Sequence, residues 1–158
     1  MIVVDTSIWS LAFRRRSRPK GVTPGVVKLL QKLTREKQQV VVPGVVLQEL
    51  LSGVKDPAQG ERIKELMEGY PLILATKELH VEAANISNVC RKAGVSAATI
   101  DCLIAAQCIL LNGVLLTLDD DFKRISGCCG LRIYLSLSPF RTDTAVADSK
   151  CSTPSDIS

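Results

Sequence analysis

The sequence lacks features that define several classes of protein. It has a single histidine, His80, in 158 residues, which excludes mechanisms that need two imidazoles, including the paired-histidine route to RNA cleavage. No apolar run approaches the roughly 18 residues of a membrane span, because Gln107, Asn112 and Gly113 interrupt the most hydrophobic region. The first five residues, Met1-Ile2-Val3-Val4-Asp5, contain no basic leader of a secretory signal. We therefore expect a cytoplasmic protein with no membrane partner.

Aromatic residues and cysteine pairs are also scarce. Aromatic residues make up 4% of the chain, so an exposed platform on which bases could stack is not evident. The six cysteines include no Cys-x-x-Cys pair, and a structural zinc site needs closely spaced ligand pairs. Most of them lie in apolar segments, where we expect reduced, buried thiols rather than zinc ligands. His80, followed by Val81 and Glu82, is expected to be a solvated helix residue.

The remaining composition is that of a folded domain. Hydrophobic residues make up 46% and charged residues 23%, which is close to the mixture found in soluble globular proteins. The length suffices for one domain with its own core and is short of two. We expect residues 1–137 to form this domain. Residues 138–158 are rich in Ser, Thr and Asp without an apolar period, which predicts a flexible polar tail.

The formal net charge is +4, and a basic segment contributes strongly to it. Five cations fall within seven residues, a density that suggests contact with a polyanion such as nucleic acid, although taken alone the segment is better explained as a solvated loop. Basic runs of this size are also common in solvated loops, so this second interpretation stays open. The residues are Arg14, Arg15, Arg16, Arg18 and Lys20.

Apolar strands alternate with amphipathic helices along the chain. Uniformly apolar strands separated by helices indicate a parallel sheet that is covered on both faces, so the predicted fold class is α/β. In such sheets ligands bind beyond the carboxyl ends of the strands. We expect strands at residues 2–4, 40–42, 114–117 and 131–135, a helix that begins at Asp5, and helices at 23–37, 43–53, 56–68, 79–92, 96–111 or 99–111, and 119–126.

Acidic residues occupy two kinds of unusual position. Asp5 and Asp119 each follow an apolar strand, where a single Asp is often a turn former or a helix N-cap. Glu49 and Asp101 interrupt apolar stretches of helices, where an unpaired carboxylate costs several kcal/mol or shifts its pKa. We therefore expect a positive partner for these acids.

A shared metal ion would compensate the four acids together. The turns around Asp101 contain no cation, and the first lysine after Glu49 is Lys55. Oxygen-rich sites suit hard cations such as Mg²⁺ or Mn²⁺ rather than zinc. The pattern thus predicts a divalent-cation site, with separate Lys or Arg partners as the alternative.

Four motifs occur in order: Asp5-Thr6-Ser7, Leu47-Gln48-Glu49-Leu50, Thr99-Ile100-Asp101-Cys102-Leu103-Ile104-Ala105-Ala106, and Thr117-Leu118-Asp119-Asp120-Asp121-Phe122. Together they resemble those of PIN-domain ribonucleases, and VapC-type toxins in particular, over residues 1 to about 137. The resemblance implies a three-layer α/β/α sandwich with a central, mainly parallel sheet. It also implies an Mg²⁺-dependent endoribonuclease, the toxin of a toxin-antitoxin pair, that hydrolyses RNA through a metal-activated water. Mn²⁺ is the second choice of cation.

The resemblance also implies a role for each acid. The fourth acid is ambiguous because three aspartates are adjacent; Asp119 is preferred, Asp121 is second, and Asp120 is expected to be exposed. The residues that match the catalytic, metal-binding quartet are Asp5, Glu49, Asp101 and Asp119.

Accessory residues and partners follow from the same resemblance. Thr117 and Asp121 match accessory positions near the fourth acid, and Ser7 or Thr6 matches a hydroxyl that supports the first. An RNA substrate, a cognate antitoxin protein and a homodimer are implied, and no nucleotide cofactor is. The basic segment at residues 14–20 receives no role from the resemblance; we consider it as a contact for RNA phosphates.

Other functions remain as alternatives at this point. The same fold can act as an RNA-binding or interaction module without nuclease activity, or as a housekeeping nuclease without an antitoxin. A haloacid-dehalogenase-like phosphatase needs a second acid two residues after Asp5, where this chain has Ser7. A receiver domain needs an acidic pair near the end of the first strand, where Asp5 stands alone.

Overall fold

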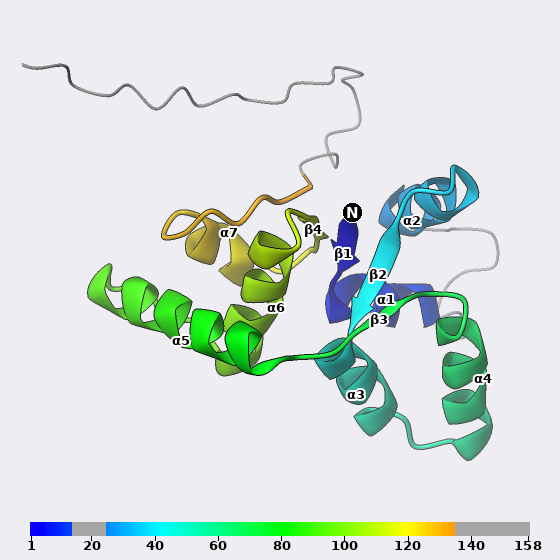
Figure 1. Ribbon diagram of the computed structural model, residues 1–158. Coiled ribbons are helices and arrows are strands. Elements are labelled where there is room, and N and C mark those ends of the chain that lie inside the picture. Colours follow the sequence, from blue (N-terminus) through cyan, green and yellow to red (C-terminus); the bar gives the residue numbers. More distant parts are fainter. Residues whose placement is uncertain (14–24, 135–158) are drawn as a thin grey trace, which may run out of the picture.

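A parallel four-stranded sheet lies at the centre of the molecule (Figure 1). The computed structural model describes residues 1–13 and 25–134. The strand order is β3-β2-β1-β4, and every neighbouring pair is parallel. This arrangement confirms the α/β prediction. The strands are β1 (Ile2–Val4), β2 (Val40–Pro43), β3 (Leu72–Ile73) and β4 (Val114–Leu116).

Helices flank the sheet and connect its strands. In Figure 1, α5, α6 and α7 lie to the left of the sheet, whereas α2 and α4 lie to the right, so the sheet forms the middle of three layers. The residues of α6 from Cys102 to Cys108 are all buried, which makes this helix part of the core. The helices are α1 (Thr6–Phe13), α2 (Gly25–Arg35), α3 (Gly44–Ser52), α4 (Pro57–Met67), α5 (Lys77–Lys92), α6 (Thr99–Leu110) and α7 (Asp121–Ser126).

The two central strands are buried along their whole length. Every residue of β1 and β2 is buried, without the alternation of a sheet that faces water. The register pairs Ile2 with Val40 on one side and with Val114 on the other. The carboxyl ends of β1, β2 and β4 therefore meet at one edge of the sheet, where the sequence places its acids.

The structure differs from the predicted elements at two places. β3 was not predicted, because it has only two residues and one of them, Leu72, is 45% exposed at the sheet edge. The predicted last strand is reduced, within the described residues, to an isolated bridge between Leu115 and Ile133. The basic segment at 14–20 and the tail at 138–158 lie outside the described residues.

Two further sequence predictions are confirmed. His80 is exposed on α5, and Cys90, Cys102 and Cys108 are buried thiols without a disulfide. Among the described helices, none combines the length and apolar character that a bilayer span requires.

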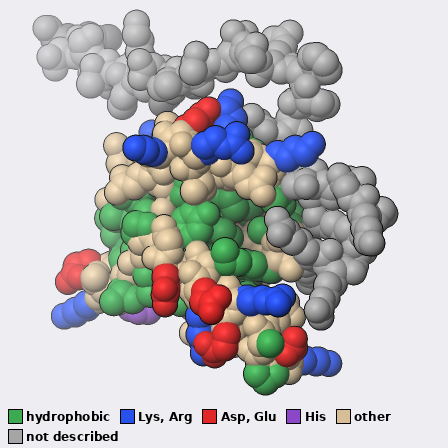
Figure 2. All heavy atoms as spheres, turned by 90° about the vertical axis from the view of Figure 1, so that its right-hand side faces the viewer, with side chains coloured by type: hydrophobic (Ala, Val, Ile, Leu, Met, Phe, Trp, Pro, Cys, Tyr) green, Lys and Arg blue, Asp and Glu red, His purple; other side chains and the backbone are tan. Residues whose placement is uncertain are grey.

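Charged side chains are unevenly placed on the face that carries α2 and α4. Figure 2 shows mainly Lys and Arg at its upper end, over α2, and a mixture of both signs at its lower end, over α4. α2 ends at Arg35, shortly before β2 begins at Val40, so its basic end lies at the amino-terminal edge of the sheet. This is the edge opposite to the acids.

Candidate active site

Asp5 is a buried carboxylate at the carboxyl end of β1. Its residue is 6% exposed, and its Oδ2 accepts three hydrogen bonds. The Ser7 amide donates one at 3.2 Å, the Ser7 hydroxyl one at 2.7 Å and the Thr117 hydroxyl one at 3.0 Å. Such bonds offset the loss of hydration that burial imposes on a charged group. Oδ2 is thereby held in one orientation, and no described side chain or amide donates to Oδ1.

The ends of β1 and β4 are joined by further hydrogen bonds. Val4 pairs with Leu116, and the Asp5 amide donates to the Leu116 carbonyl at 3.0 Å. The Ser7 hydroxyl accepts from the Leu118 amide, and the Thr117 hydroxyl accepts from the Asp119 amide. Each hydroxyl thus donates to Asp5 and accepts from the segment after β4. This double contact sets Asp119 beside Asp5.

Glu49 reaches the same edge from α3, the helix that follows β2. Its residue is exposed, so the burial cost expected from its apolar neighbours in the sequence does not apply to it. Its Oε2 accepts a 2.5 Å hydrogen bond from the Thr6 hydroxyl at the start of α1. Sequence reasoning offered Thr6 or Ser7 as the hydroxyl that supports Asp5. In the structure Ser7 contacts Asp5, and Thr6 contacts Glu49.

Asp101 joins the group from the first turn of α6. Because α6 precedes β4 and runs back along the sheet, its first turn comes to the carboxyl edge of the strands. Burial raises the pKa of Asp101 to about 6, and neighbouring negative charges add to the effect. In decreasing order these belong to Asp119, Asp5, Asp121 and Glu49. The predicted acids therefore share one electrostatic environment.

In the described part of the chain, the acids of this region that form ion pairs are Asp120 and Asp121. Lys123 pairs with Asp120 at 2.6 Å, and Arg124 pairs with Asp121. Among the described residues, no Lys or Arg forms an ion pair with Asp5, Glu49, Asp101 or Asp119. The described residues therefore do not show the alternative arrangement, in which a separate Lys or Arg neutralises each of these four acids. Asp120 is exposed, as predicted.

Asp119 and Asp121 differ in their contacts. The Asp121 amide donates to Asp119 Oδ1 at 2.9 Å, and the Asp121 carboxylate is committed to Arg124. Asp119 is exposed and has no basic partner among the described residues. Asp119 therefore has the freer carboxylate of the two.

The donor set fits a hard divalent cation. All its oxygens come from carboxylates, and the like charges around Asp101 would be relieved by a positive ion. In the described part of the chain, no three His, Cys, Asp or Glu side chains already stand at the mutual spacing of a metal site. Binding would thus draw the acids together, and Glu49 and Asp119, both exposed, have the freedom to move.

One contact of the candidate site had no signal in the sequence. Thr6 and Glu49 are 43 residues apart, and nothing in either segment indicates that they meet. The pairing depends on the parallel neighbours β1 and β2, which bring the start of α1 beside α3. Knowledge of the strand order would have been needed to find it.

Comparisons with known proteins agree with this geometry. The model of the PIN domain family matches residues 2–127. A comparison with curated protein sequences finds no match.

Several solved structures share the fold. A chain of the crystal structure of VapBC2 from Rickettsia felis, bound to a promoter DNA fragment, matches with a TM-score of 0.68 and 21% identity, covering 85% of this chain and 98% of that one. A chain of a toxin-antitoxin complex from Klebsiella pneumoniae matches with a TM-score of 0.62 and 18% identity, covering 83% of this chain and 95% of that one. VapC20 from Mycobacterium tuberculosis, described as a sarcin-ricin loop cleaving toxin, matches with a TM-score of 0.59 and 19% identity. The match covers 84% of this chain and 99% of that one. With the family model spanning most of the sequence and the acids meeting at one sheet edge, this chain belongs to the PIN domain family.

Proposed function

We propose that this protein is a metal-dependent endoribonuclease that hydrolyses RNA phosphodiester bonds through an activated water. The observation that carries the proposal is the environment of Asp101, whose pKa is raised by burial and by four neighbouring carboxylates. Among the described residues, no Lys or Arg forms an ion pair with Asp101 or with the other three acids of the quartet. Perturbed carboxylates gathered at the carboxyl edge of a parallel sheet are typical of functional sites.

Asp5, Glu49, Asp101 and Asp119 would hold Mg²⁺, or Mn²⁺, with Asp121 as the alternative fourth ligand. The ion would supply a water of lowered pKa and would neutralise charge that develops on the phosphate. Ser7 and Thr117 orient Asp5 by hydrogen bonds to Oδ2, and Thr6 orients Glu49. Such supporting contacts fix the geometry of metal-binding carboxylates.

A water activated by the metal ion needs no side-chain nucleophile. The single histidine, His80, is exposed on α5, away from the first turn of α6 where Asp101 lies. Attack by water, rather than by the neighbouring 2′-hydroxyl of RNA, leaves a 5′-phosphate and a 3′-hydroxyl. The chemistry of the product ends therefore reports the mechanism.

Cleavage of single-stranded RNA by the purified protein tests the proposal. We expect activity with Mg²⁺ or Mn²⁺, none with EDTA, and products that carry 5′-phosphates. Asp120→Asn serves as the control variant, because this acid is exposed and paired with Lys123. Cleavage that survives EDTA, or products with a 2′,3′-cyclic phosphate, would refute the metal-activated water. RNA binding without cleavage under every metal condition would favour a non-catalytic RNA-binding module.

We further propose that the enzyme is the toxin of a toxin-antitoxin pair, acts in the cytoplasm and forms a homodimer. The fold it shares with the Rickettsia felis and Klebsiella pneumoniae complexes supports an antitoxin partner. A short open reading frame beside the gene, encoding a small DNA-binding protein, would supply the candidate. Its co-expression should abolish RNA cleavage and should yield a stable complex on gel filtration. A gene without such a neighbour would favour a housekeeping nuclease.

A further inference from the structure

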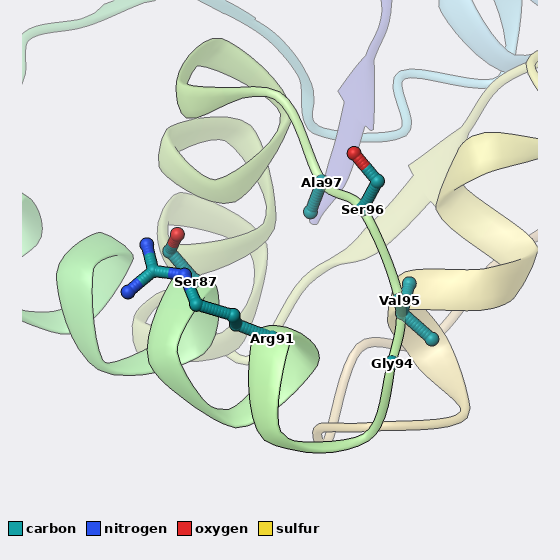
Figure 3. A pocket seen from close by; sticks show the side chains of 6 residues that line it. All are labelled: Ser87, Arg91, Gly94, Val95, Ser96 and Ala97. Carbon is teal, nitrogen blue, oxygen red and sulfur yellow. The ribbon is translucent and has the colours of Figure 1, made fainter.

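A polar pocket of about 350 Å³ lies between the end of α5 and the loop that leads into α6 (Figure 3). Two of its lining side chains come from the last two turns of α5, and the others come from the loop. Its lining residues are Ser87, Arg91, Gly94, Val95, Ser96 and Ala97.

The backbone after α5 creates the pocket. Gly94 has a φ of +73°, a conformation that side chains with a Cβ rarely adopt. The Gly94 amide donates to the Arg91 carbonyl, and the Val95 amide donates to the Cys90 carbonyl, as in a helix ending at glycine. The chain therefore turns sharply, and residues 94–97 stand beside α5 as the second wall.

The pocket lies next to the acids. Ala97 on its wall precedes Asp101 by four residues, and α6 begins at Thr99 between them. From the other wall, Ser87 lies near Cys102, the residue that follows Asp101, since burial raises the pKa of the Cys102 thiol and Ser87 lowers it by a smaller amount. The pocket thus adjoins the start of α6, the helix that carries Asp101 in its first turn.

Arg91 gives this pocket a positive charge. It is exposed, and among the described residues its guanidinium hydrogen-bonds only Asn88, at 3.3 Å, without an ion pair. Figure 3 shows the guanidinium beside the Ser87 hydroxyl group. No basic residue contributes to the pKa of Asp101, so Arg91 does not serve to neutralise the acids.

An acidic site that acts on RNA needs cations nearby. Its carboxylates repel the phosphates that flank the bond to be cut, and this repulsion must be offset for the strand to stay in place. Lys123 and Arg124 are paired with aspartates, and the basic end of α2 lies at the opposite edge of the sheet. Among the residues that line this pocket, Arg91 is the cation, and within the described part of the chain it has no acidic partner.

We propose that this pocket binds a backbone phosphate of the RNA strand, beside the phosphate that is cut. Arg91 supplies charge-assisted hydrogen bonds, and the neighbouring Ser87 hydroxyl supplies a further donor. A phosphate held in this place would fix the register of the strand over the acids. The inference rests on the proposed function, because the substrate is taken to be RNA.

Two variants with the same loss of charge test the proposal. Lys92 is exposed in the same turn of α5 but does not line the pocket, so Arg91→Gln and Lys92→Gln form a matched pair. Binding of single-stranded RNA is measured in EDTA, where no cleavage is expected, at several salt concentrations. We expect Arg91→Gln to weaken binding roughly tenfold or more and to reduce the salt slope by about 0.7, the value for one phosphate on a single strand. Lys92→Gln should change affinity by less than about twofold.

Filling the pocket separates shape from charge. Ser96→Phe leaves the net charge unchanged and should weaken RNA binding as well, with an unaltered melting temperature because Ser96 is exposed. Equal effects of Arg91→Gln and Lys92→Gln, or full RNA affinity in Ser96→Phe, would overturn the phosphate site. Cleavage by the wild-type protein is read separately. If the wild-type protein cleaves no RNA with any metal while RNA binding still depends on Arg91, the nuclease proposal is wrong and the proposed phosphate site is retained.

Discussion

The Thr117 hydroxyl donates a 3.0 Å hydrogen bond to Oδ2 of Asp5, across 112 residues of sequence. The same oxygen of Thr117 accepts from the Asp119 amide. One hydroxyl therefore orients the first acid of the site and positions the segment that carries the fourth. Its removal should therefore disturb both acids.

Thr117→Val keeps the shape of the side chain and removes this hydroxyl. Because Asp5 is buried, loss of one donor should lower the free energy of unfolding by about 1–3 kcal/mol. Nuclease activity should fall by roughly 10-fold to 100-fold, as for other residues that support metal ligands. Urea unfolding and initial cleavage rates provide the two measurements.

The control is Thr34→Val on α2, where the hydroxyl bonds the Leu30 carbonyl. It should leave RNA cleavage unchanged because Thr34 has no contact with the acids. Wild-type activity in Thr117→Val would show that the hydroxyl does not position the site.

Asp101 should make the metal-free protein less stable as the pH rises. Its pKa is about 6 in the folded chain against an ordinary 3.8, so between these values the folded state binds more protons than the unfolded state. Stability in EDTA should therefore decrease from about pH 4 to pH 6 on account of this group. Asp101→Asn should remove that decrease and raise the melting temperature at pH 7, while reducing cleavage roughly 100-fold or more.

Asp120→Asn is the comparison for this pH profile. The Lys123 hydrogen bond and charge hold the pKa of Asp120 below its ordinary value, so this variant should not raise the neutral-pH melting temperature. In EDTA, the melting temperature of the wild-type protein should fall more between pH 4 and pH 6 than that of Asp101→Asn. Equal changes in the two proteins would contradict the assigned environment of Asp101.

Divalent cations should stabilise the folded protein. A ligand that binds only the folded state raises stability with the logarithm of its concentration, by about 2.7 kcal/mol at 100 times its Kd. Mg²⁺ titrations followed by thermal melting should therefore show a continuing rise in Tm at pH 7. The Mg²⁺-induced increase in Tm should be much smaller in Asp5→Asn than in the wild-type protein. It should be unchanged in Glu61→Gln, because Glu61 pairs with Lys64 on α4. Equal shifts in all three proteins would indicate nonspecific binding.

The sequence predicted most of the sheet because its strands are continuous apolar runs. Residues 2–4 and 40–42 are fully buried β-branched segments, a pattern that few alternative structures satisfy. β3 left no such pattern, since its position is determined by pairing of Val42 with Leu72 at an exposed edge. The acids that meet at the site could likewise be identified from their positions after strands or within apolar helices.

The contacts that hold those acids could not be predicted. The bonds of Thr6 with Glu49 and of Thr117 with Asp5 join segments that are distant in sequence, and they depend on strand order. The pocket of Arg91 depends on a turn at Gly94 and on the packing of α5 against α6. Local patterns in the sequence indicate which residues are unusual, whereas the partners of each residue follow from the tertiary fold.

The three adjacent aspartates are the remaining ambiguity of the site, and their contacts predict how they differ. Asp121 is paired with Arg124, whereas Asp119 has a freer carboxylate close to Asp101. Asp119→Asn should therefore abolish Mg²⁺-induced stabilisation and cleavage, and Asp121→Asn should reduce cleavage by less than about tenfold. Arg124→Gln provides the decisive comparison, because it frees Asp121 to approach the ion. If Asp121 were the true ligand, Arg124→Gln would strengthen Mg²⁺ binding and Asp119→Asn would retain it.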